Sequence, residues 1–461
     1  MRLPKRPPNW NSTLSEKRDE VLKAWGDPAY TEFVQKLDRY YVPWDKFRFK
    51  ATHSGLNPEL AWVIAKFGRL ARMRELPLRG FSRNLQYSIP DLVQRELMII
   101  DQELAGRLSA EIEQPFTPSQ RERFIINALH EEAIASSMLE GAATTREEAK
   151  KMLRTQRTPR NHGEWMVLNN YQTILHVREN LDVELTPEFL LELQSMLTKN
   201  TVEKDRLDII GRFRNKDEDI KVVDSRDNVT VHVPPDADEL PMRMKELCEF
   251  ANRSQHEDHF VHPVVKACIL HFQLGFDHPF CDGNGRTARA IFYWSLLRDG
   301  YWLFEFLPIS RLIYVSPISY SRAYAFTETD EFDVTYFLMY KLRIISLARQ
   351  ELRQYLQVKQ RELRQAQTWF GSDDSVNHRQ REVVMQFVRE PERQLTIQEH
   401  QNRFQIVYQT ARQDLLELED AGYLEKTKVG KQYHFRRGSR IEALYAKKSK
   451  RSIRSTVPRL R

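Results

Sequence analysis

The stretch between positions 278 and 289 decides what fold this chain can have. It reads His278-Pro279-Phe280-Cys281-Asp282-Gly283-Asn284-Gly285-Arg286-Thr287-Ala288-Arg289. Strongly apolar helical patterns flank it, one before it up to Phe276 and one after it from Ala290. Glycines in such a loop allow backbone conformations that bulkier residues cannot adopt, so main-chain N–H groups can line a concave anion-binding site. The stretch therefore predicts an anion-binding loop between two buried helices.

The charged residues of this stretch supply the groups that phosphoryl or nucleotidyl transfer needs. A helix that begins near Arg286 points the positive end of its dipole into the loop, and Arg286 and Arg289 on its first turn suit phosphate oxygens. Asp282 can hold Mg²⁺ beside phosphates, and His278 can take up a proton near neutral pH. The plain alternative is a glycine-rich helix cap with a structural histidine and two solvated arginines.

The same residues resemble the signature of the Fic family, which is HPF, one variable residue, Asp or Glu, Gly-Asn, Gly or Lys, and Arg, usually with another Arg three residues later. Every fixed position matches. The resemblance implies a mainly α-helical Fic core that transfers AMP from ATP to a hydroxyl side chain of a target protein. It implies that His278 is the catalytic base and that Asp282 holds Mg²⁺. The residues implied to hold the nucleotide are Gly283, Asn284, Gly285, Arg286, Thr287, Ala288, Arg289 and Tyr320, the last with a core role as its alternative.

A second motif lies upstream and reads Ser136-Ser137-Met138-Leu139-Glu140-Gly141. Fic proteins that restrain themselves carry Ser or Thr, three residues, and Glu followed by Gly or Asn, on a helix beside the nucleotide site. The resemblance implies that Ser136, Glu140 and Gly141 form this inhibitory element. Glu140 would pair with Arg289 and deny it to the γ-phosphate, and such a pair is geometrically specific when partly buried.

One hairpin is expected between the helices. Residues 220–224 and 229–233 are rich in β-branched side chains, and residues 225–228 between them are turn formers. With the preceding Gly211–Arg214, this resembles the flap of Fic proteins, which implies that it holds the target segment by strand addition. A purely structural hairpin is the alternative.

The remaining sequence reads mostly as helix. We expect an N-terminal helical region over 1–115, a Fic domain over 116–369, a winged helix-turn-helix over 376–440 and a basic tail over 441–461. The N-terminal region carries no chemical motif that we identify. The third of these regions shows three helical patterns followed by a two-stranded wing, which is the element order of a winged helix.

The basic charge belongs to the C-terminus. The net charge is +7, but residues 426–461 hold 13 Lys and Arg and one acidic residue, a local +12 that leaves −5 for the first 425 residues. The exposed face of the third C-terminal helix would carry Tyr408, Gln409, Arg412 and Gln413. Such side chains contact DNA in some winged helices and proteins or a second copy in others, so DNA contact, protein contact and a homodimer all stay open.

Several protein classes are excluded by composition. No apolar run reaches the roughly 20 residues that a membrane span needs, and the basic N-terminus lacks the apolar segment of a secretory signal. The three cysteines, Cys248, Cys268 and Cys281, fit no zinc-site spacing. We therefore expect a cytoplasmic protein without a membrane partner.

Two other functions stay open beside autoinhibited AMP transfer. The first is removal of AMP from a modified protein, with Glu140 aligning a water. The second is a DNA-binding regulator that uses the Fic core as a nucleotide sensor. The intact His278 and Asp282 speak against the second, because a sensor needs no base.

Overall fold

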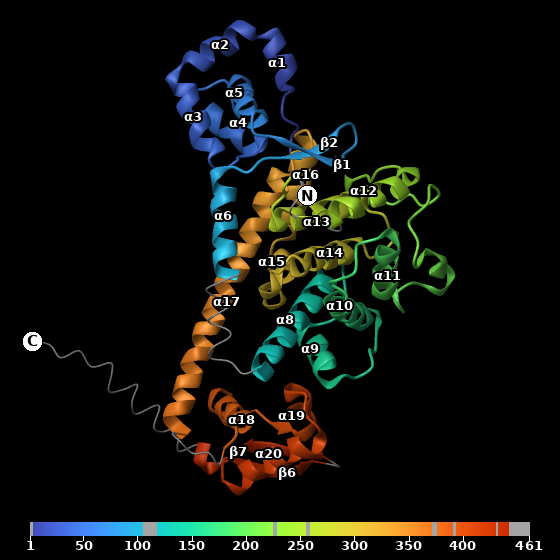
Figure 1. Cartoon of the computed structure of the whole chain (residues 1–461), viewed down its shortest axis with the longest axis vertical. Coiled ribbons are helices and arrows are strands. Elements are labelled where there is room, and N and C mark those ends of the chain that lie inside the picture. The colour runs from blue at the N-terminus through green and yellow to red at the C-terminus, as the bar shows by residue number, and fades with distance from the viewer. Residues whose placement is uncertain are drawn as a thin grey trace, which may run out of the picture. The chain divides into compact units, whose positions relative to one another are not determined.

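The computed structural model describes residues 3–104, 118–224, 228–254, 259–370, 376–390, 393–429 and 432–441. Helices dominate this part of the chain and the strands are short (Figure 1), so the mainly α prediction is confirmed. The chain divides into two compact units. One comprises Met1–Ala110, Ala128–Ala149 and Pro159–Gln350, and the other Glu111–Asn127, Lys150–Thr158 and Glu351–Arg461.

The first unit opens with five helices around a small core of their own. Trp62 and Phe47 lie fully buried in this core, and Asn57 caps the central helix α5, which has Pro58 at its first position. The helices are α1 (Trp10–Glu16), α2 (Arg18–Gly26), α3 (Pro28–Asp38), α4 (Trp44–His53) and α5 (Pro58–Leu70).

A hairpin follows that sequence analysis did not predict. Strand β1 (Arg74–Arg79) pairs antiparallel with β2 (Asn84–Tyr87), and helix α6 (Asp91–Gln102) comes next. Leu76 and Leu78 of β1 are buried while their neighbours are exposed. This alternation covers too few residues to stand out from the helical pattern before it.

Charged side chains of α5 tie these first helices to the rest of the unit. Nζ of Lys66 lies 2.8 Å from the Asp330 carboxylate, and Arg69 donates to the Tyr336 hydroxyl at 2.7 Å. Both α5 side chains are buried. Because a buried charge is stable only when it is paired, these bonds fix where α5 packs.

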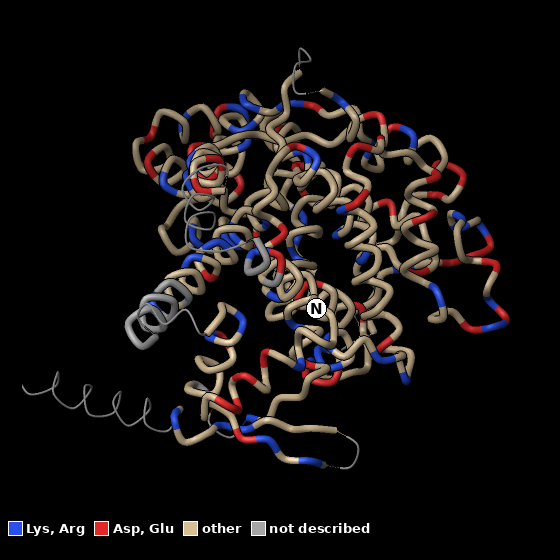
Figure 2. Tube along the Cα trace, turned by 60° about the horizontal axis from the view of Figure 1, so that its bottom comes forward, with Lys and Arg blue, Asp and Glu red and all other residues tan. Residues whose placement is uncertain are grey.

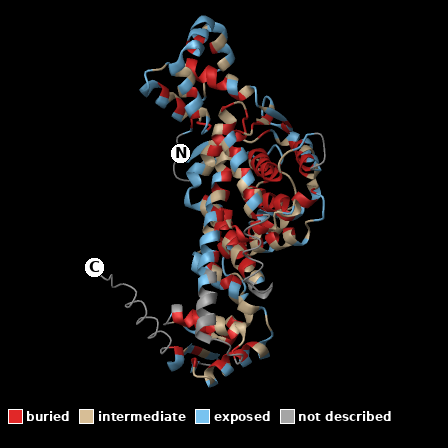
Figure 3. Ribbon diagram, turned by 60° about the vertical axis from the view of Figure 1, so that its left-hand side comes forward, coloured by how far each residue is buried: buried red, intermediate tan, exposed pale blue. Residues whose placement is uncertain are grey.

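The centre of the unit is the helix pair α13 (Pro263–Asp277) and α14 (Asn284–Arg298), which pack side by side (Figure 1). Every residue of α13 except Gly275 is buried, as the helices in the middle of Figure 3 illustrate. A helix that is apolar on all sides must lie inside a core. The remaining helices up to residue 370 are α8 (Pro118–Leu139), α9 (Arg146–Thr155), α10 (His162–Glu179), α11 (Pro187–Thr198), α12 (Leu240–Asn252), α15 (Ile309–Val315), α16 (Pro317–Thr329) and α17 (Thr335–Phe370).

The predicted hairpin is present. Strands β3 (Val222–Asp224) and β4 (Val229–His232) pair antiparallel, with a register shift between Val222 and Val223. Residues 225–227 of the predicted turn lie outside the described residues. Within the part of the chain that the structure describes, β3 and β4 pair only with each other, so their outer edges are not taken by another strand.

The second unit contains the elements predicted near the C-terminus. These are α18 (His378–Arg389), α19 (Ile397–Phe404), α20 (Tyr408–Asp420) and the hairpin β6 (Leu424–Val429) and β7 (Gln432–Arg437). The capping box of Thr396 and Glu399 is present, and a short strand β5 (Leu395–Thr396), which was not predicted, pairs with β7. Residues 371–375, between the predicted Fic domain and the predicted winged helix, and the predicted basic tail after Ile441 lie outside the described residues.

Charge is spread over the described chain rather than gathered on one element. Figure 2 shows basic and acidic residues interspersed along the trace. Among the residues that the structure describes, no helix combines the length and the apolar composition that crossing a membrane requires.

A buried carboxylate holds the three C-terminal helices together. Asp414 of α20 accepts hydrogen bonds from Arg379 at 2.6 and 2.8 Å, from Asn377 at 2.8 Å and from His400 at 3.0 Å. Burial alone would raise the pKa of Asp414, but these hydrogen bonds hold it well below its usual range. The carboxylate is therefore ionised in the folded unit and stabilises it at neutral pH.

Replacing Asp414 tests this interaction. We expect Asp414→Ala to destabilise the unit by about 3 kcal/mol, because breaking a buried pair leaves uncompensated polar groups. Since the pKa of Asp414 is lowered on folding, its contribution is complete at neutral pH and is lost as the pH falls below the usual carboxyl range. Hydrogen exchange of peptides from residues 378–441 measures the effect. The exposed Arg412→Ala on the same helix is the control, and equal exchange in the two variants would contradict the assignment.

Candidate active site

The loop that sequence analysis singled out joins α13 to α14. His278 caps α13 in the left-handed region, with φ of 47°, and Gly283 precedes α14 with φ of 93°. Asn284 fixes the loop between them, because its side chain accepts from the Phe280 N–H at 2.9 Å and donates to the Phe280 carbonyl at 2.7 Å. Helix α14 begins at Asn284, two residues earlier than predicted.

His278 is held in one protonation state. Its Nδ1 lies 3.2 Å from the carbonyl oxygen of Gly275, and a carbonyl can only accept, so Nδ1 carries the proton of the neutral ring. Burial, the largest effect, lowers the pKa of His278 to about 4. The imidazole is therefore neutral at pH 7, and its Nε2 has a lone pair available to a proton.

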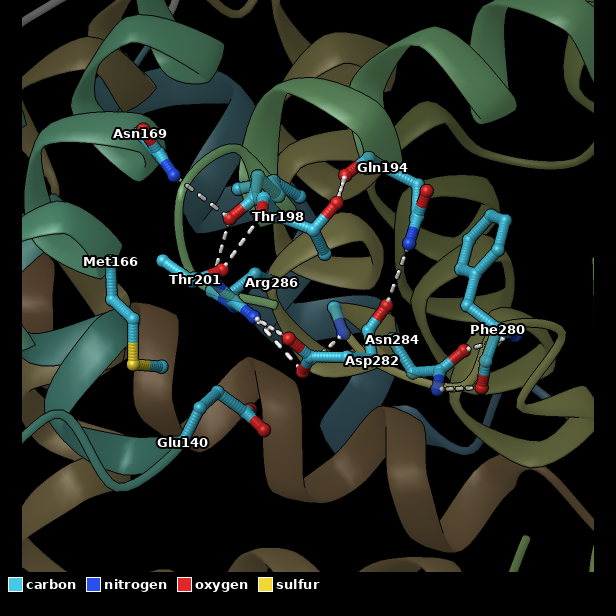
Figure 4. A network of polar contacts seen from close by, with 12 residues as sticks. Glu140, Met166, Asn169, Gln194, Thr198, Thr201, Phe280, Asp282, Asn284 and Arg286 are labelled. Carbon is cyan, nitrogen blue, oxygen red and sulfur yellow. Dashed lines mark hydrogen bonds and ion pairs between the residues drawn. The ribbon is translucent and has the colours of Figure 1, made fainter. Parts of the chain in front are cut away.

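Asp282 lies beside the start of α14 with its carboxylate 45 % exposed. It accepts from the N–H of Gly283 at 2.7 Å and, through both oxygens, from Nη2 of Arg286 at 3.0 Å (Figure 4). A single half-exposed carboxylate at the mouth of an anion site suits a Mg²⁺ ion that phosphates also bind.

Arg286 is buried beneath the loop. Its Nη1 donates to the Leu197 carbonyl at the end of α11 at 2.8 Å. Its Nε is buried and has no hydrogen-bond partner among the described residues. The next two residues face inward, since Thr287 donates its hydroxyl to the Gly283 carbonyl and Ala288 is fully buried. The Thr287 and Ala288 side chains therefore pack at the start of α14, whereas Nε of Arg286 is a donor without a partner in the described structure.

Arg289 is buried and bonded to the end of α8. Its Nε donates to the Ser136 hydroxyl at 2.8 Å, and its Nη2 donates to the Ser136 carbonyl at 3.1 Å and to the Glu140 carboxylate at 2.8 Å. Burial alone would lower the pKa of Arg289, but the charge of Glu140 raises it. The structure thus brings together the two motifs that are 149 residues apart in the sequence.

The Glu140 carboxylate occupies the space over Gly285. A Cβ atom added to Gly285 would meet Oε1 of Glu140, so a larger residue at this position would displace the carboxylate. Figure 4 shows the Glu140 side chain directed toward the region of Asp282 and Arg286. The first turn of α14 favours an anion because of its helix dipole. A carboxylate already occupies this anion position.

Buried polar contacts anchor the helix that carries Glu140. The hydroxyl of Ser137 donates to the Met166 carbonyl at 3.1 Å, and Asn170 donates to the Ala133 carbonyl at 3.1 Å. After Glu140 the chain turns at Gly141, with φ of 89°, a value that favours glycine. The body of α8 is therefore fixed, and Glu140 lies just beyond its last turn.

Tyr320 lies behind the arginine rather than in the loop. Its hydroxyl and Nε2 of His271 are 2.8 Å apart, and Nδ1 of His271 is 3.2 Å from Lys341. Burial, opposed by the charge of Arg289, raises the pKa of Tyr320. This places Tyr320 in a buried polar chain next to Arg289, and His271 belongs to that chain and not to the loop.

Gln194 of α11 is a site residue that sequence analysis missed. It is fully buried, its Nε2 donates to the Asp282 carbonyl at 3.3 Å, and its Oε1 accepts from the Gly211 N–H at 2.7 Å. It joins the loop to the segment before the hairpin. Nothing in the local sequence marks it, because a glutamine on an amphipathic helix has no distinctive spacing. Burial and the nearby Glu218 carboxylate raise the pKa of Cys281 to about 12, so its thiol is protonated at neutral pH.

Comparisons with known proteins identify the same region. Residues 184–296 match a family model described as Fic/DOC family. The chain is 24% identical over 290 residues to protein adenylyltransferase Fic of Drosophila grimshawi, covering 62% of this chain and 52% of that protein. It is 26% identical over 297 residues to the protein of the same name from Drosophila mojavensis, covering 62% and 50%. The chain spans about half the length of these curated relatives.

Solved structures of Fic proteins are also similar to this chain. A Fic family protein from Desulfovibrio desulfuricans has 22% identity and a TM-score of 0.47, covering 79% of this chain and 99% of that one. Residues 134–508 of Fic-1 from C. elegans have 16% identity and a TM-score of 0.44, covering 58% and 72%. The match to the family model includes the loop and both of its flanking helices except the last residues of α14. The part of this chain that is similar to the Fic/DOC family model is thus residues 184–296.

Proposed function

We propose that this chain is a protein adenylyltransferase that moves AMP from ATP to a hydroxyl side chain of a target protein and is held inactive at rest by Glu140. The observation that carries the proposal is the loop at 278–289. It has an unprotonated imidazole nitrogen at one end and an anion site with two buried arginines at the other. The Drosophila relatives are named protein adenylyltransferase Fic, which supports the same activity for this chain.

The proposed reaction needs one base and one set of phosphate ligands. Nε2 of His278 accepts the proton of the target hydroxyl while the hydroxyl oxygen bonds to the α-phosphorus of ATP. The bond from that phosphorus to the bridging oxygen breaks, and pyrophosphate leaves with the bridging electrons. Catalysis then depends mainly on positioning and on stabilisation of negative charge, which the rigid loop and Arg286 supply.

The residues present fit ATP and Mg²⁺. Arg286 has a buried donor without a partner in the described structure, and the bare backbone of Gly285 leaves room for an anion where Glu140 now lies. Asp282 would hold the metal, because Mg²⁺ is usually bound by one or two carboxylates together with phosphates and water. When bound, the ion neutralises charge on the phosphates.

The hairpin is proposed to hold the target. The outer edges of β3 and β4 are not paired with another described strand, and Val223 and Val229 are exposed on them. An extended peptide added to such an edge bonds through its main chain, so it is placed with little demand on its sequence. A target hydroxyl would then be presented to His278 by backbone pairing.

The resting state is proposed to be a competition between two anions. Arg289 is buried and must have an anionic or polar partner. At rest Glu140 is that partner. The γ-phosphate of ATP would take its place in the active state. Because the Glu140 side chain is 33 % exposed and lies beyond the anchored part of α8, only the end of the helix has to move.

Variants of Glu140 test the proposed activity. We expect Glu140→Gly to raise AMP transfer about tenfold to a hundredfold, since a hydrogen bond to a charged group contributes roughly 1.5–3 kcal/mol, and Glu140→Gln to raise it less. The measurement is incorporation of label into protein from ATP labelled at the α-phosphate. His278→Ala in the Glu140→Gly background should abolish incorporation. Label entering from the γ-phosphate instead, or none in any variant, contradicts the proposal.

The pH profile tests the base. Because the pKa of His278 is about 4 in the free protein, the neutral form dominates above that value and is lost below it. We expect kcat/KM of Glu140→Gly to change little between about pH 5.5 and about pH 8, since kcat/KM reports the free enzyme. Initial rates in buffers of constant ionic strength measure this. A fall centred near the ordinary histidine pKa would mean that His278 is not buried as described.

The second unit is proposed to contact protein rather than DNA. Two basic residues of its hairpin are paired within the unit: Lys426 with Glu419 at 2.7 Å and Arg436 with Glu425 at 2.9 Å. Phosphate binding would have to break such pairs. We expect the full chain to bind duplex DNA only weakly and without sequence preference in fluorescence anisotropy. Tight retention of one sequence over a scrambled duplex at physiological salt would favour DNA recognition instead.

A further inference from the structure

The carbonyl groups at the C-terminal end of helix α13 need hydrogen-bond donors from outside the helix. Residues 214–235, which carry the β3–β4 hairpin and which we call the flap segment, supply several of them. The last four carbonyls of an α-helix have no partner within the helix, and those of α13 lead directly into the loop with the catalytic histidine. Each carbonyl from Leu274 to Phe280 nevertheless accepts a hydrogen bond. The donors are, in order, His278 N, His278 Nδ1, His232 Nε2, Arg214 Nη2, Arg214 Nε, Arg214 N and Asn284 Nδ2.

One residue supplies three consecutive bonds of this series. Arg214 donates from Nη2 to the Asp277 carbonyl at 3.3 Å, from Nε to the His278 carbonyl at 2.9 Å, and from its backbone N–H to the Pro279 carbonyl at 2.8 Å. It is only 7% exposed. A guanidinium holds its donors in a fixed fork, so one side chain can bind two neighbouring carbonyls at once.

The same guanidinium also closes the flap segment. Nη2 of Arg214 donates to the Pro235 carbonyl at 2.5 Å. Arg214 precedes β3 and Pro235 follows β4, so the two ends of the segment that carries the hairpin meet on one side chain. At the last residue of β4, Nε2 of His232 lies 2.7 Å from the Phe276 carbonyl oxygen, and its Nδ1 lies 2.9 Å from the Glu328 carboxylate. The hairpin and the loop are therefore held as one structure.

We propose that Arg214 is a positioning residue for His278, which it holds in its left-handed conformation, and that it links the flap to the base. This rests on the proposed function, in which the flap presents the target and His278 accepts its proton. Arg214 would then fix the position of a target docked on the hairpin relative to His278. Its guanidinium joins the start of the flap segment to the end of that segment at Pro235, and it also bonds to the carbonyl of His278.

Electrostatics give Arg214 a measurable effect on the base. The charged groups that act on His278 are Arg214 before β3, His232 on β4 and Glu140 after α8. Both cations disfavour a second proton on the ring, and the Glu140 carboxylate favours it. Removing the charge of Arg214 therefore raises the pKa of His278, and the acid limb of the rate profile moves to higher pH.

Two substitutions separate charge from geometry. Both substitutions are made in the active Glu140→Gly background. R214M removes the positive charge and the paired N–H donors of the guanidinium, whereas R214K keeps the charge but replaces the paired donors with one ammonium group. We expect R214M to lower kcat about tenfold to a hundredfold, the size of effect that a displaced catalytic group produces. KM for ATP should stay within about twofold, since no group of the phosphate site bonds to Arg214 in the described structure. The pH at which the rate falls on the acid side of the profile should be higher in R214M and unchanged in R214K. In R214K kcat should nevertheless fall.

The control is R212M, two residues away. Arg212 pairs with Asp208 and Glu218 on the same segment and makes no bond to residues 277–279 in the described structure. Its loss would loosen the segment without touching the base. Thermal denaturation checks that each variant is folded, and if R214M fails to fold, R214K against R212M decides by kcat.

The outcomes separate this inference from the proposed function. If the Glu140→Gly parent transfers no AMP, the proposed function fails. If the parent is active and R214M and R214K match R212M in kcat and in the acid limb, Arg214 has no positioning role. A rise in KM for ATP with kcat unchanged would equally overturn it, because that result assigns Arg214 to nucleotide binding.

Discussion

The site depends on the burial of two guanidinium groups on the first turns of one helix. Arg286 and Arg289 of α14 are both about 1% exposed. A buried charge without partners costs several kcal/mol. The elements that pack against these side chains must therefore supply hydrogen-bond acceptors. The end of α11 brings the Leu197 carbonyl, the loop brings Asp282, and the end of α8 brings Ser136 and Glu140.

Under the proposed function, this constraint would let one carboxylate regulate the site. Because Arg289 is buried and favours an anionic partner, the proposed resting and active states of the natural chain would differ in which anion binds it, Glu140 or the γ-phosphate. The hydrogen bonds from Arg289 to Ser136 remain available in both states, because Ser136 lies within α8 while Glu140 lies beyond its last turn. A switch of this kind needs no movement of the helix core.

Local chemistry could be predicted from the sequence, and long-range packing could not, except for the pair of Glu140 and Arg289 that the family resemblance implied. The loop, its flanking helices and the capping box at Thr396 follow from short patterns with direct physical meaning, and the structure contains them. Arg214 lies in the stretch 211–214, which resembles part of the Fic flap, yet its side chain bonds to residues 63 and 64 positions later in the sequence. The partner of Lys66 is 264 positions away. No local periodicity encodes such pairs, since they are set by how helices pack in three dimensions.

The position of the base between two opposed helix ends has a consequence for its strength. His278 follows the C-terminal end of α13, whose dipole favours a protonated ring, but burial, helped by the charges of His232 and Arg214, outweighs it and lowers the pKa to about 4. An imidazole with so low a pKa is a weak acceptor on its own. Phosphates at the start of α14 would add negative charge within the same enclosed site and raise that pKa. In the proposed reaction the base therefore gains strength when the nucleotide is in place, and the free protein keeps it unreactive.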